Sequence, residues 1–415
     1  MEWKRLIDES HSSYLPLKNK LEEIKDYFLK KSNEEILEEK GVSLLGGASG
    51  ISLFLLQYGS AFNEEEVFDK GIDLISLVFN TLGSMDLLDT HAGGLSGIGW
   101  LLEYFEQKKF IECDTDEVLS DCDEILYSSM ITNIKEHENF DFLHGGIGNI
   151  LYFLNRKKSK VIASYIQEFI DELYKYAVKE EDGGIKFRSK IYPKENVEQW
   201  VYNLSLSHGM VSIMIAMAKI IRKYPEVKGP KELLYGIYKY VRRYDNFYKE
   251  ELARFPSWIN YNEEDPPSTG SRLGWCYGDL GIGMAMLISG DIIGDNELKA
   301  YGKDILEETT KRKTKLETNI NDGCLCHGTA GIIHIYNRAF QYTSSDKLKK
   351  GAEYHANALP QDFSDDNFPL GYKLLRLDSV EFEDTFLEGI AGVGLVIIAL
   401  ITDQSPDWDA SLLIS

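Results

Sequence analysis

Two cysteines and a histidine share one short segment of this chain, "GCLCHGTAG" at residues 323–331. Cys326 is next to His327, and Cys324 lies two residues earlier. The chain has only five cysteines, and another of them, Cys276, also precedes a Gly-x-x-Gly pair. Thiolate and imidazole groups are common zinc ligands. Two thiolates and one imidazole would leave the fourth position on the metal open, as in catalytic rather than structural zinc sites.

The spacing of these residues leaves two alternatives open. Buried cysteines often serve as small hydrophobic residues without any metal. Cys324 is also close enough in the sequence to replace Cys326 as a ligand, and the C-x-x-C pair of structural zinc sites is absent. Adjacent residues can both ligate one metal where the backbone turns sharply. The Cys326–His327 pair therefore favours a sharp turn at the start of a helix.

The glycine pair belongs to a repeat with seven copies. Each copy places Gly-x-x-Gly, or in one case Gly-x-x-Ser, at the start of an apolar run. The fourth copy has Ser212 instead of its second glycine, which predicts altered packing there. Segments between the copies, such as 169–179 and 297–312, have apolar residues at helical spacing. The first glycines are Gly47, Gly94, Gly145, Gly209, Gly278, Gly328 and Gly389.

We expect each glycine pair to begin an inner helix and an outer helix to return from it. Glycine would allow positive φ in the turn and close approach of neighbouring backbones. One helical hairpin cannot bury its apolar stripe alone, so the hairpins must stack. The stack either stays open as a solenoid or closes into a ring. The apolar last repeat, at 389–401, does not resemble a polar capping repeat, which favours an all-α fold of the α/α toroid type.

The candidate ligands share one register of the repeat. With the first glycine of each copy as position zero, Asp141 lies at position −4. Cys276 and Cys326 lie at −2, and the residues at −1 include His144, His208 and His327. In a toroid these positions are the loops that lead into the inner helices, where helix N-termini supply free backbone N–H groups. The register therefore predicts that Cys276, Cys326 and His327 meet at one rim of the cavity.

Composition disfavours several functions and locations. The formal net charge of −22 argues against nucleic-acid binding, which needs clustered positive charge. Five cysteines in 415 residues do not indicate a disulfide framework. The N-terminus lacks the apolar core of a signal peptide, so a cytoplasmic location is expected. The most apolar segments, 204–221 and 389–401, contain polar residues or glycines and are predicted to be buried helices rather than membrane spans.

Four segments resemble the lanthionine synthetase C-like family, and the resemblance extends from about residue 42 to the C-terminus. They are "DFLHGGIG" (141–148), "SLSHGM" (205–210), "SRLGWCYGDLG" (271–281) and "CLCHGTAG" (324–331). The resemblance implies a toroid of seven inner and seven outer helices with Zn²⁺ held by Cys276, Cys326 and His327. It also implies an enzyme that adds a peptide cysteine to dehydroalanine or dehydrobutyrine and so closes (methyl)lanthionine thioether rings.

Acid–base and positioning roles carry over from the resemblance to four further residues: His208, Asp141, Arg272 and Tyr277. His208 has a suitable intrinsic pKa for proton transfer, and Asp141 would orient its ring. Arg272 would stabilise negative charge on the substrate or orient Asp141. Without the resemblance, His208 and Tyr277 would be interpreted as core residues, Asp141 as a helix cap and Arg272 as a surface residue. His144 and His91 are expected to be structural.

The resemblance also implies partners. The substrate would be a dehydrated precursor peptide with leader and core, and a separate dehydratase and a transporter would form a membrane-associated complex with the cyclase. Residues 1–41 are too few for a dehydratase and are predicted to form a helical extension. The cyclase domain would span 42–415, with insertions near 181–200 and 246–271, and the second of these would overlie the cavity or be a loop without a role.

Two other functions remain open from the sequence. A protein-prenyltransferase-like β subunit would also be a helical toroid that activates a peptide thiol with zinc. Its zinc ligands would include a carboxylate, and none adjoins Cys276 or Cys326. A non-catalytic zinc- and thiol-binding scaffold of the same fold would lack the acid–base residues. The presence of both His208 and Asp141 argues against the scaffold.

Overall fold

The computed structural model describes residues 2–194, 197–247, 252–262, 268, 270–376 and 378–415. Within this part of the chain most residues are helical, and the strands form only small sheets, so the predicted all-α class is confirmed. The chain divides into two compact units. Unit 1 comprises Met1–Leu88, Ala92–Glu112 and Lys313–Asp409, and unit 2 comprises Asp89–His91, Cys113–Arg312 and Ala410–Ser415.

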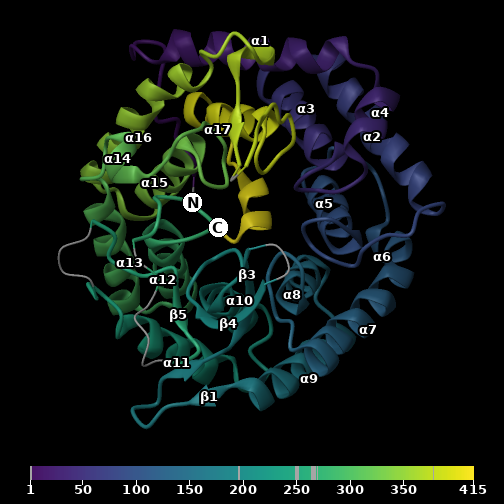
Figure 1. Ribbon diagram of the computed structural model, residues 1–415. Coiled ribbons are helices and arrows are strands. Elements are labelled where there is room, and N and C mark those ends of the chain that lie inside the picture. Colours follow the sequence, from purple (N-terminus) through teal and green to yellow (C-terminus); the bar gives the residue numbers. More distant parts are fainter. Residues whose placement is uncertain (1, 195–196, 248–251, 263–267, 269, 377) are drawn as a thin grey trace. The chain divides into compact units, whose positions relative to one another are not determined.

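Unit 1 is built mainly from paired helices. Consecutive helices α3 and α4 pack together, as do α15 and α16, and α17 packs on α3 and α15 (Figure 1). Helices α1 and α2 occupy the segment predicted as a helical extension, and they pack on α17 and α4, respectively. The elements of this unit are α1 (Tyr14–Lys30), α2 (Asn33–Lys40), α3 (Ala48–Phe62), α4 (Glu65–Leu82), α5 (Leu95–Gln107), α14 (Lys315–Thr318), α15 (Thr329–Thr343), α16 (Asp346–Ala358), η1 (Leu359–Asp362), η2 (Pro369–Gly371), β6 (Leu374–Leu375), β7 (Val380–Glu381) and α17 (Ile390–Ile401), after which η3 (Asp407–Leu412) follows in the sequence.

Unit 2 follows the same plan. Helix α10 packs on α11, α12 and α8, while α12 also packs on α13, and α7 packs on α8 and α9. The elements are α6 (Thr115–Val118), α7 (Ser120–His137), α8 (Gly146–Asn155), α9 (Lys160–Tyr176), β1 (Val178–Lys179), β2 (Ile185–Lys186), β3 (Ser189–Lys194), β4 (Val197–Asn203), α10 (Met210–Lys223), α11 (Pro230–Arg242), β5 (Trp258–Asn260), α12 (Asp279–Ile293) and α13 (Asn296–Thr309).

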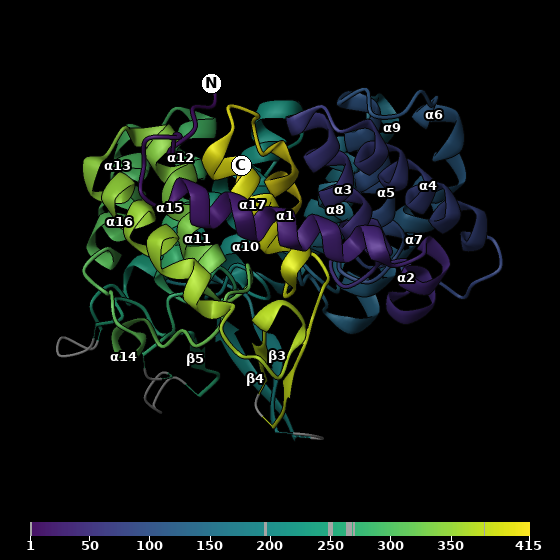
Figure 2. The same ribbon diagram turned by 90° about the horizontal axis from the view of Figure 1, so that it is seen from above.

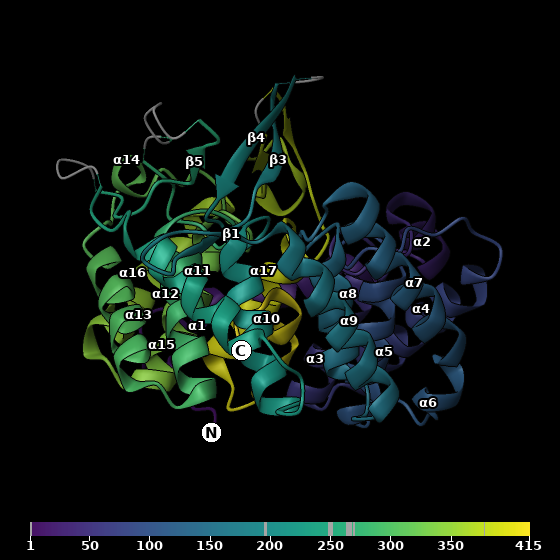
Figure 3. The ribbon, with the colours of Figure 1, turned by 90° about the horizontal axis from the view of Figure 1, so that it is seen from below.

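The largest sheet lies in the two segments that were predicted as insertions. Strands β3, β4 and β5 form an antiparallel sheet in this order, with Val201 opposite Asn260 and Asn203 opposite Trp258. Strands β3 and β4 extend away from the helices of unit 2 (Figures 2 and 3). Parts of both predicted insertions, at 195–196, 248–251, 263–267 and 269, lie outside the described residues. The pairing of β4 with β5 thus connects the two predicted insertions just before α10 in the sequence.

Each of the seven inner helices, α3, α5, α8, α10, α12, α15 and α17, begins one residue after the first glycine of its repeat. The predicted positive φ is wrong at six of these glycines, whose φ lies between −113° and −149° in the extended region. Only Gly278 has a positive φ, of 95°. The residues before each of these helices form a turn, after which the chain enters a largely buried helix. Helix α17 is buried along its whole length, which explains its apolar sequence.

Close backbone approach is the reason for the second glycine. A Cβ atom on Gly392 would lie 1.9 Å from the carbonyl oxygen of Phe386, three residues before the first glycine. In four other repeats the corresponding carbonyl, three residues before the first glycine, would collide in the same way with a Cβ atom on the second glycine. These second glycines are Gly50, Gly148, Gly281 and Gly331. Ser212 replaces the second glycine in the fourth repeat, where it is buried and its hydroxyl donates to the Gly209 carbonyl at 2.7 Å.

Gly392→Ala is therefore expected to destabilise unit 1. An inserted methyl group that forces the backbone to move costs about 1–3 kcal/mol in a packed interior. Urea unfolding followed by circular dichroism should show a lower free energy of unfolding. Gly83→Ala is the matched control, because nothing lies within 4 Å of its added Cβ and its φ is −66°. Equal stability of the two variants would contradict the steric argument.

Neighbouring turns are joined through their backbones at position −2. In unit 1, the Cys326 N–H donates to the Leu387 carbonyl at 3.0 Å, and the Leu387 N–H donates to the Leu45 carbonyl at 2.9 Å. In unit 2, the Ser207 N–H donates to the Cys276 carbonyl at 3.3 Å. Main-chain hydrogen bonds thus fix the backbone of the cysteine position relative to the neighbouring turn.

No helix in the described ranges combines the length and the apolar character that are needed to cross a membrane. The apolar segment 204–221 runs from the end of β4 through the turn into α10, and 389–401 contains α17. Both are buried within their units, as the sequence predicts.

Candidate functional site

Two neighbouring turns of unit 2 bring His208 and Asp141 together. His208 Nδ1 lies 2.7 Å from Asp141 Oδ2. The other carboxylate oxygen of Asp141, Oδ1, accepts the backbone N–H groups of Leu143 at 2.7 Å and His144 at 2.8 Å. Asp141 is therefore both a cap for its own turn and the partner of His208. Because one oxygen is fixed by two backbone donors, the other is held in a defined direction toward the ring.

The Asp141 carboxylate determines how His208 titrates. Burial by itself lowers the pKa of His208, but the hydrogen bond and the negative charge of Asp141 raise it, and the net pKa lies above the ordinary value of 6.5. His144 lies beside this pair, with its ring 5.8 Å from that of His208 and the two planes 18° apart. Burial lowers the pKa of His144. At neutral pH His208 is thus the more readily protonated of the two rings.

Asp141→Asn is expected to move the pKa of His208 from above 6.5 to below it, because the burial penalty remains while the anion is removed. The amide oxygen of Asn can still accept the two N–H groups of the turn, so the backbone should be unchanged. An NMR titration of the histidine ring protons, with His208→Asn for assignment, measures this pKa directly. A pKa for His208 that is the same in the wild type and in Asp141→Asn would contradict the role of the carboxylate.

The same shift has a consequence for stability. A histidine whose pKa is raised on folding stabilises the native state fully below its unfolded pKa, near ~6.5. This stabilisation is lost as the pH rises through the folded pKa of His208. The free energy of unfolding of the wild type, relative to His208→Asn, should therefore decrease through that range.

Tyr277 lies on the same side of unit 2. Its ring centroid is 6.2 Å from that of His208 and 6.3 Å from that of Trp258 on β5. Asn203 Nδ2 donates to the phenol oxygen at 3.4 Å. Burial raises the pKa of Tyr277, so the phenol stays protonated at neutral pH. The Tyr277 hydroxyl is thus a neutral hydrogen-bond donor near His208, and Trp258 of strand β5 packs against its ring.

Arg272 is exposed. Within the described part of the chain its guanidinium has no hydrogen bond or ion pair, and Asp141 bonds instead to His208 and to its own turn. The structure thus brings together His208, Asp141 and Tyr277, while Arg272 lies at the surface six residues before Gly278. Of its two expected roles, orientation of Asp141 has no support among the described contacts.

Cys276 belongs to the turn of unit 2 that leads into α12. It forms no disulfide, and its side chain is 8% exposed. The residues on both sides of it are anchored: the buried Trp275 indole donates to the Leu412 carbonyl at 3.0 Å. Asp279 accepts the N–H groups of Arg254 and Phe255, each at 3.0 Å. These contacts fix the turn, so the position of the sulfur is set before any ligand binds.

Asp279 is a buried carboxyl group that was not predicted from the sequence, and burial raises its pKa. Arg312 lies 3.4 Å from its carboxylate and also donates to the Ser271 carbonyl at 2.8 Å. Together they connect the turn before α12 to the segment that leads into β5. The only sequence signal was an acidic residue directly after Gly278, the first glycine of its repeat. Its partner is 33 residues away and was not predictable.

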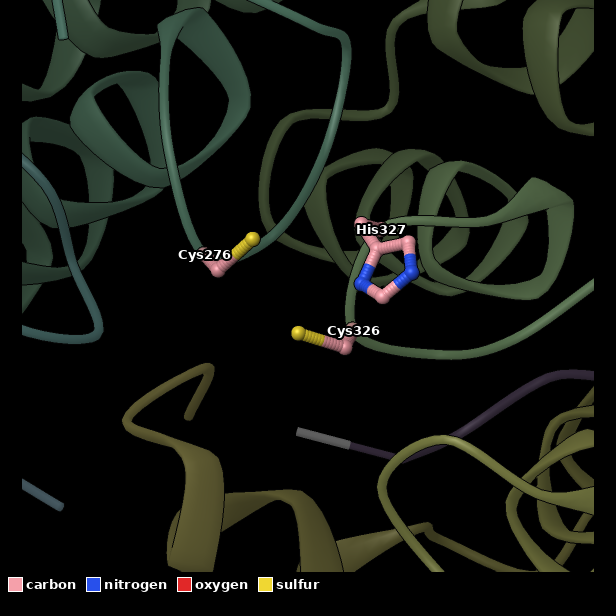
Figure 4. A group of neighbouring side chains, drawn as sticks. All are labelled: Cys276, Cys326 and His327. Carbon is pink, nitrogen blue, oxygen red and sulfur yellow. The ribbon is translucent and has the colours of Figure 1, made fainter. Parts of the chain in front are cut away.

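Cys326 and His327 lie on one turn of unit 1, and Figure 4 shows both side chains. The Cys326 sulfur and one nitrogen of the His327 ring lie on the same side of this turn. Cys324 has a different role: its sulfur accepts the His327 N–H at 3.3 Å, as the Ser205 hydroxyl accepts the His208 N–H at 3.1 Å. Cys324 is fully buried, and burial raises the pKa of its thiol far above the ordinary range. The geometry therefore favours Cys326 over Cys324 as a metal ligand.

The expected structural role of His91 agrees with its surroundings. The ring is fully buried, Nε2 lies 2.8 Å from the Ser411 carbonyl, and burial lowers the pKa to about 4. A neutral imidazole that is bonded to a main-chain carbonyl stabilises the fold and is not available for proton transfer at neutral pH.

Comparison with solved structures first defines the class of fold. The chain matches "Nisin cyclase" with a TM-score of 0.72 over 96% of this chain and 97% of that one, at 19% sequence identity. It therefore shares the fold of that protein. A family model described as "Lanthionine synthetase C-like protein" matches residues 38–413. The chain belongs to this family, which confirms the resemblance of its motifs.

One curated relative covers nearly the same length. "Nisin biosynthesis protein NisC" of Lactococcus lactis subsp. lactis is 21% identical over 410 residues, which are 88% of this chain and 87% of that protein. The match thus extends far beyond the four motif segments and includes both units.

Proposed function

We propose that this protein is a zinc-dependent lanthipeptide cyclase that forms (methyl)lanthionine rings in a dehydrated precursor peptide. Membership of the family over residues 38–413 carries the proposal. The 2.7 Å contact between His208 and Asp141 supports it, since a scaffold that only binds thiols would not need an oriented histidine. Tyr277 beside this pair supplies a further donor.

The donor set fits zinc. Cys276 and Cys326 form no disulfide and lie at the same −2 position of two turns, and His327 follows Cys326 directly. We propose that these three residues hold the ion. Two thiolates and one imidazole match a catalytic zinc site with an open position. A bound zinc ion would keep a peptide thiol deprotonated at neutral pH, where a free thiol with pKa near ~8.5 is mostly protonated.

The proposed reaction adds the peptide cysteine across the double bond of a dehydro residue. A bond forms between the cysteine sulfur and the β-carbon, the C=C π bond breaks, and its electron pair moves onto the amide as an enolate. The α-carbon then takes a proton, and the enolate returns to an amide. The thiol has lost one proton and the α-carbon has gained one, so no oxidant, reductant or nucleotide is consumed.

His208 is the proposed donor of the α-proton. Its Nδ1 is occupied by Asp141, so Nε2 is the nitrogen left to face the substrate. The raised pKa keeps a larger fraction of the ring protonated at neutral pH than burial alone would allow. We propose the neutral Tyr277 phenol or the Arg272 guanidinium as the donor toward the enolate oxygen. Donors that stabilise developing charge usually provide a large part of catalysis.

The wider expectations follow from the same proposal. We infer that residues 42–415 form the cyclase domain. Dehydration of the precursor would be carried out by a separate dehydratase. A transporter would complete a complex at the membrane, with the cyclase on the cytoplasmic side.

A single assay tests the activity. The protein is incubated with zinc and a dehydrated precursor peptide, remaining thiols are alkylated, and the adducts are counted by mass spectrometry. We expect fewer alkylated thiols at no change in peptide mass before alkylation, because cyclisation is an isomerisation. Consumption of thiols at the rate of the enzyme-free control, across several dehydrated peptides, would favour a scaffold instead.

A further inference from the structure

Four of the seven turns that lead into the inner helices have a side-chain cap at position −6. The side-chain oxygens of Asn139, Asn203, Asp322 and Glu383 each accept the backbone N–H of the residue two positions later, at 3.2, 2.9, 3.3 and 3.2 Å. Two of the four capping residues are asparagines, so an amide oxygen is sufficient for this contact. The aspartate occurs in the turn that holds Cys326 and His327.

Asp322 has a second oxygen that the two asparagines lack. Its Oδ2 lies 3.5 Å from His327 Nε2, which is an ion-pair contact and longer than an N–H···O hydrogen bond. The same oxygen accepts the Leu375 N–H at 3.4 Å. The side chain is almost fully buried. The carboxylate is thus held by backbone donors on both oxygens and directed at one particular nitrogen of the His327 ring.

The other ring nitrogen, Nδ1, has different surroundings. Figure 4 shows one ring nitrogen on the side of the Cys326 sulfur and the other facing away from it. Glu388 Oε1 is 3.8 Å from Nδ1, which is farther than Asp322 Oδ2 is from Nε2. The Glu388 carboxylate is also paired with Arg376 at 3.0 Å. Since Nε2 faces Asp322, Nδ1 is the nitrogen available to a metal.

We propose that Asp322 is a positioning residue that places the ring proton of His327 on Nε2 and leaves the Nδ1 lone pair free for the metal. A neutral imidazole has one donor and one acceptor nitrogen, and the partner of one nitrogen decides the state of the other. Carboxylates commonly fix metal-binding histidines in this way. The inference deepens the proposed zinc site and rests on it for its functional meaning.

The tautomer itself tests the inference without metal or activity. Long-range ¹H–¹⁵N correlation spectra of metal-free, ¹⁵N-histidine-labelled protein at a pH where the ring is neutral report which nitrogen carries the proton, and His327→Gln assigns the signal. We expect the Nε2–H form in the wild type. In Asp322→Asn the amide oxygen can still cap the turn, as in Asn139 and Asn203, and its NH₂ group would face Nε2. The Nδ1–H form should then increase. An Nδ1–H tautomer in the wild type overturns the inference.

Zinc affinity, measured by chelator competition, provides the second readout. Asp322→Asn should bind zinc about 10–100-fold more weakly, the usual effect of losing such a partner. Asp362→Asn is the matched control, since this carboxylate also lies near Gly323 but has no described contact with His327, and it should bind as the wild type does. Wild-type affinity in Asp322→Asn would overturn the inference.

A third variant separates positioning from direct ligation. Ligand atoms of Asp322, Cys324 and His327 all lie within 4.8 Å of one another, which is compatible with a metal bound by these three. If Asp322 only positions His327, Cys324→Ser should keep its zinc affinity; an equal loss in Cys324→Ser and Asp322→Asn would overturn the inference in favour of ligation. If the wild type shows the Nε2–H tautomer but binds no zinc and closes no rings, the proposed function fails while the tautomer assignment stands.

Discussion

Cys326→Ala is expected to bind zinc more than about 100-fold more weakly than the wild type, because losing a ligand should cost at least as much as losing a residue that orients one. Cyclisation should fall to the enzyme-free rate at zinc concentrations that saturate the wild type. The reason is that Cys326 lies at the −2 position with its sulfur on the same side as a His327 nitrogen. Zinc content is measured by elemental analysis after gel filtration, and thiol consumption by alkylation and mass.

Cys324→Ser is the control for this prediction. The serine hydroxyl can accept the His327 N–H as Ser205 accepts that of His208, so the turn should keep its shape. Full zinc content is expected in this variant. If Cys324→Ser lost the metal and Cys326→Ala kept it, the proposed ligand set would be wrong, and Cys324 would replace Cys326 in it.

His208→Asn is expected to slow ring closure by about 10²–10⁴-fold, the usual contribution of a general acid or base. Zinc content should stay at the wild-type level, because His208 is not among the proposed ligands. Single-turnover measurements with a dehydrated peptide, at saturating enzyme, separate this effect from peptide binding. The rate constant should fall while the enzyme concentration at half-saturation changes little.

Two variants make the His208 prediction specific. His144→Asn removes the neighbouring ring at 5.8 Å without touching the contact with Asp141, and near-normal rates are expected. Asp141→Asn should slow the reaction less than His208→Asn, since the ring remains but loses its orientation and raised pKa. A His208→Asn protein as fast as His144→Asn would exclude His208 as the proton donor.

The repeat was the strongest feature of the sequence, and its physical cause is local. A Cβ atom at Gly392 would collide with a carbonyl six residues earlier in the chain, so the spacing of the glycines reflects a constraint within a single turn. This is why the starts of all seven inner helices were predicted correctly. The predicted positive φ failed at six of them because close packing, rather than backbone handedness, requires the glycine there.

Contacts between distant segments were less accessible to prediction. The approach of His208 to Asp141 followed from the shared register, but the Asp279–Arg312 pair had no such signal, since α12 and α13 separate the two residues. The pairing of β4 with β5 likewise joins segments that only the folded unit brings together. Asp322 would have been noticed if the register had been extended from position −4 to position −6, where two asparagines already showed a pattern.

The hydrogen bonds between turns at position −2 involve only main-chain atoms. Any residue except proline can make them, so they do not depend on the side chain at this position. Leucine stands there in the last repeat, at Leu387, and cysteine in the one before it. New chemistry can therefore be installed around the molecule one substitution at a time, with the scaffold itself left intact.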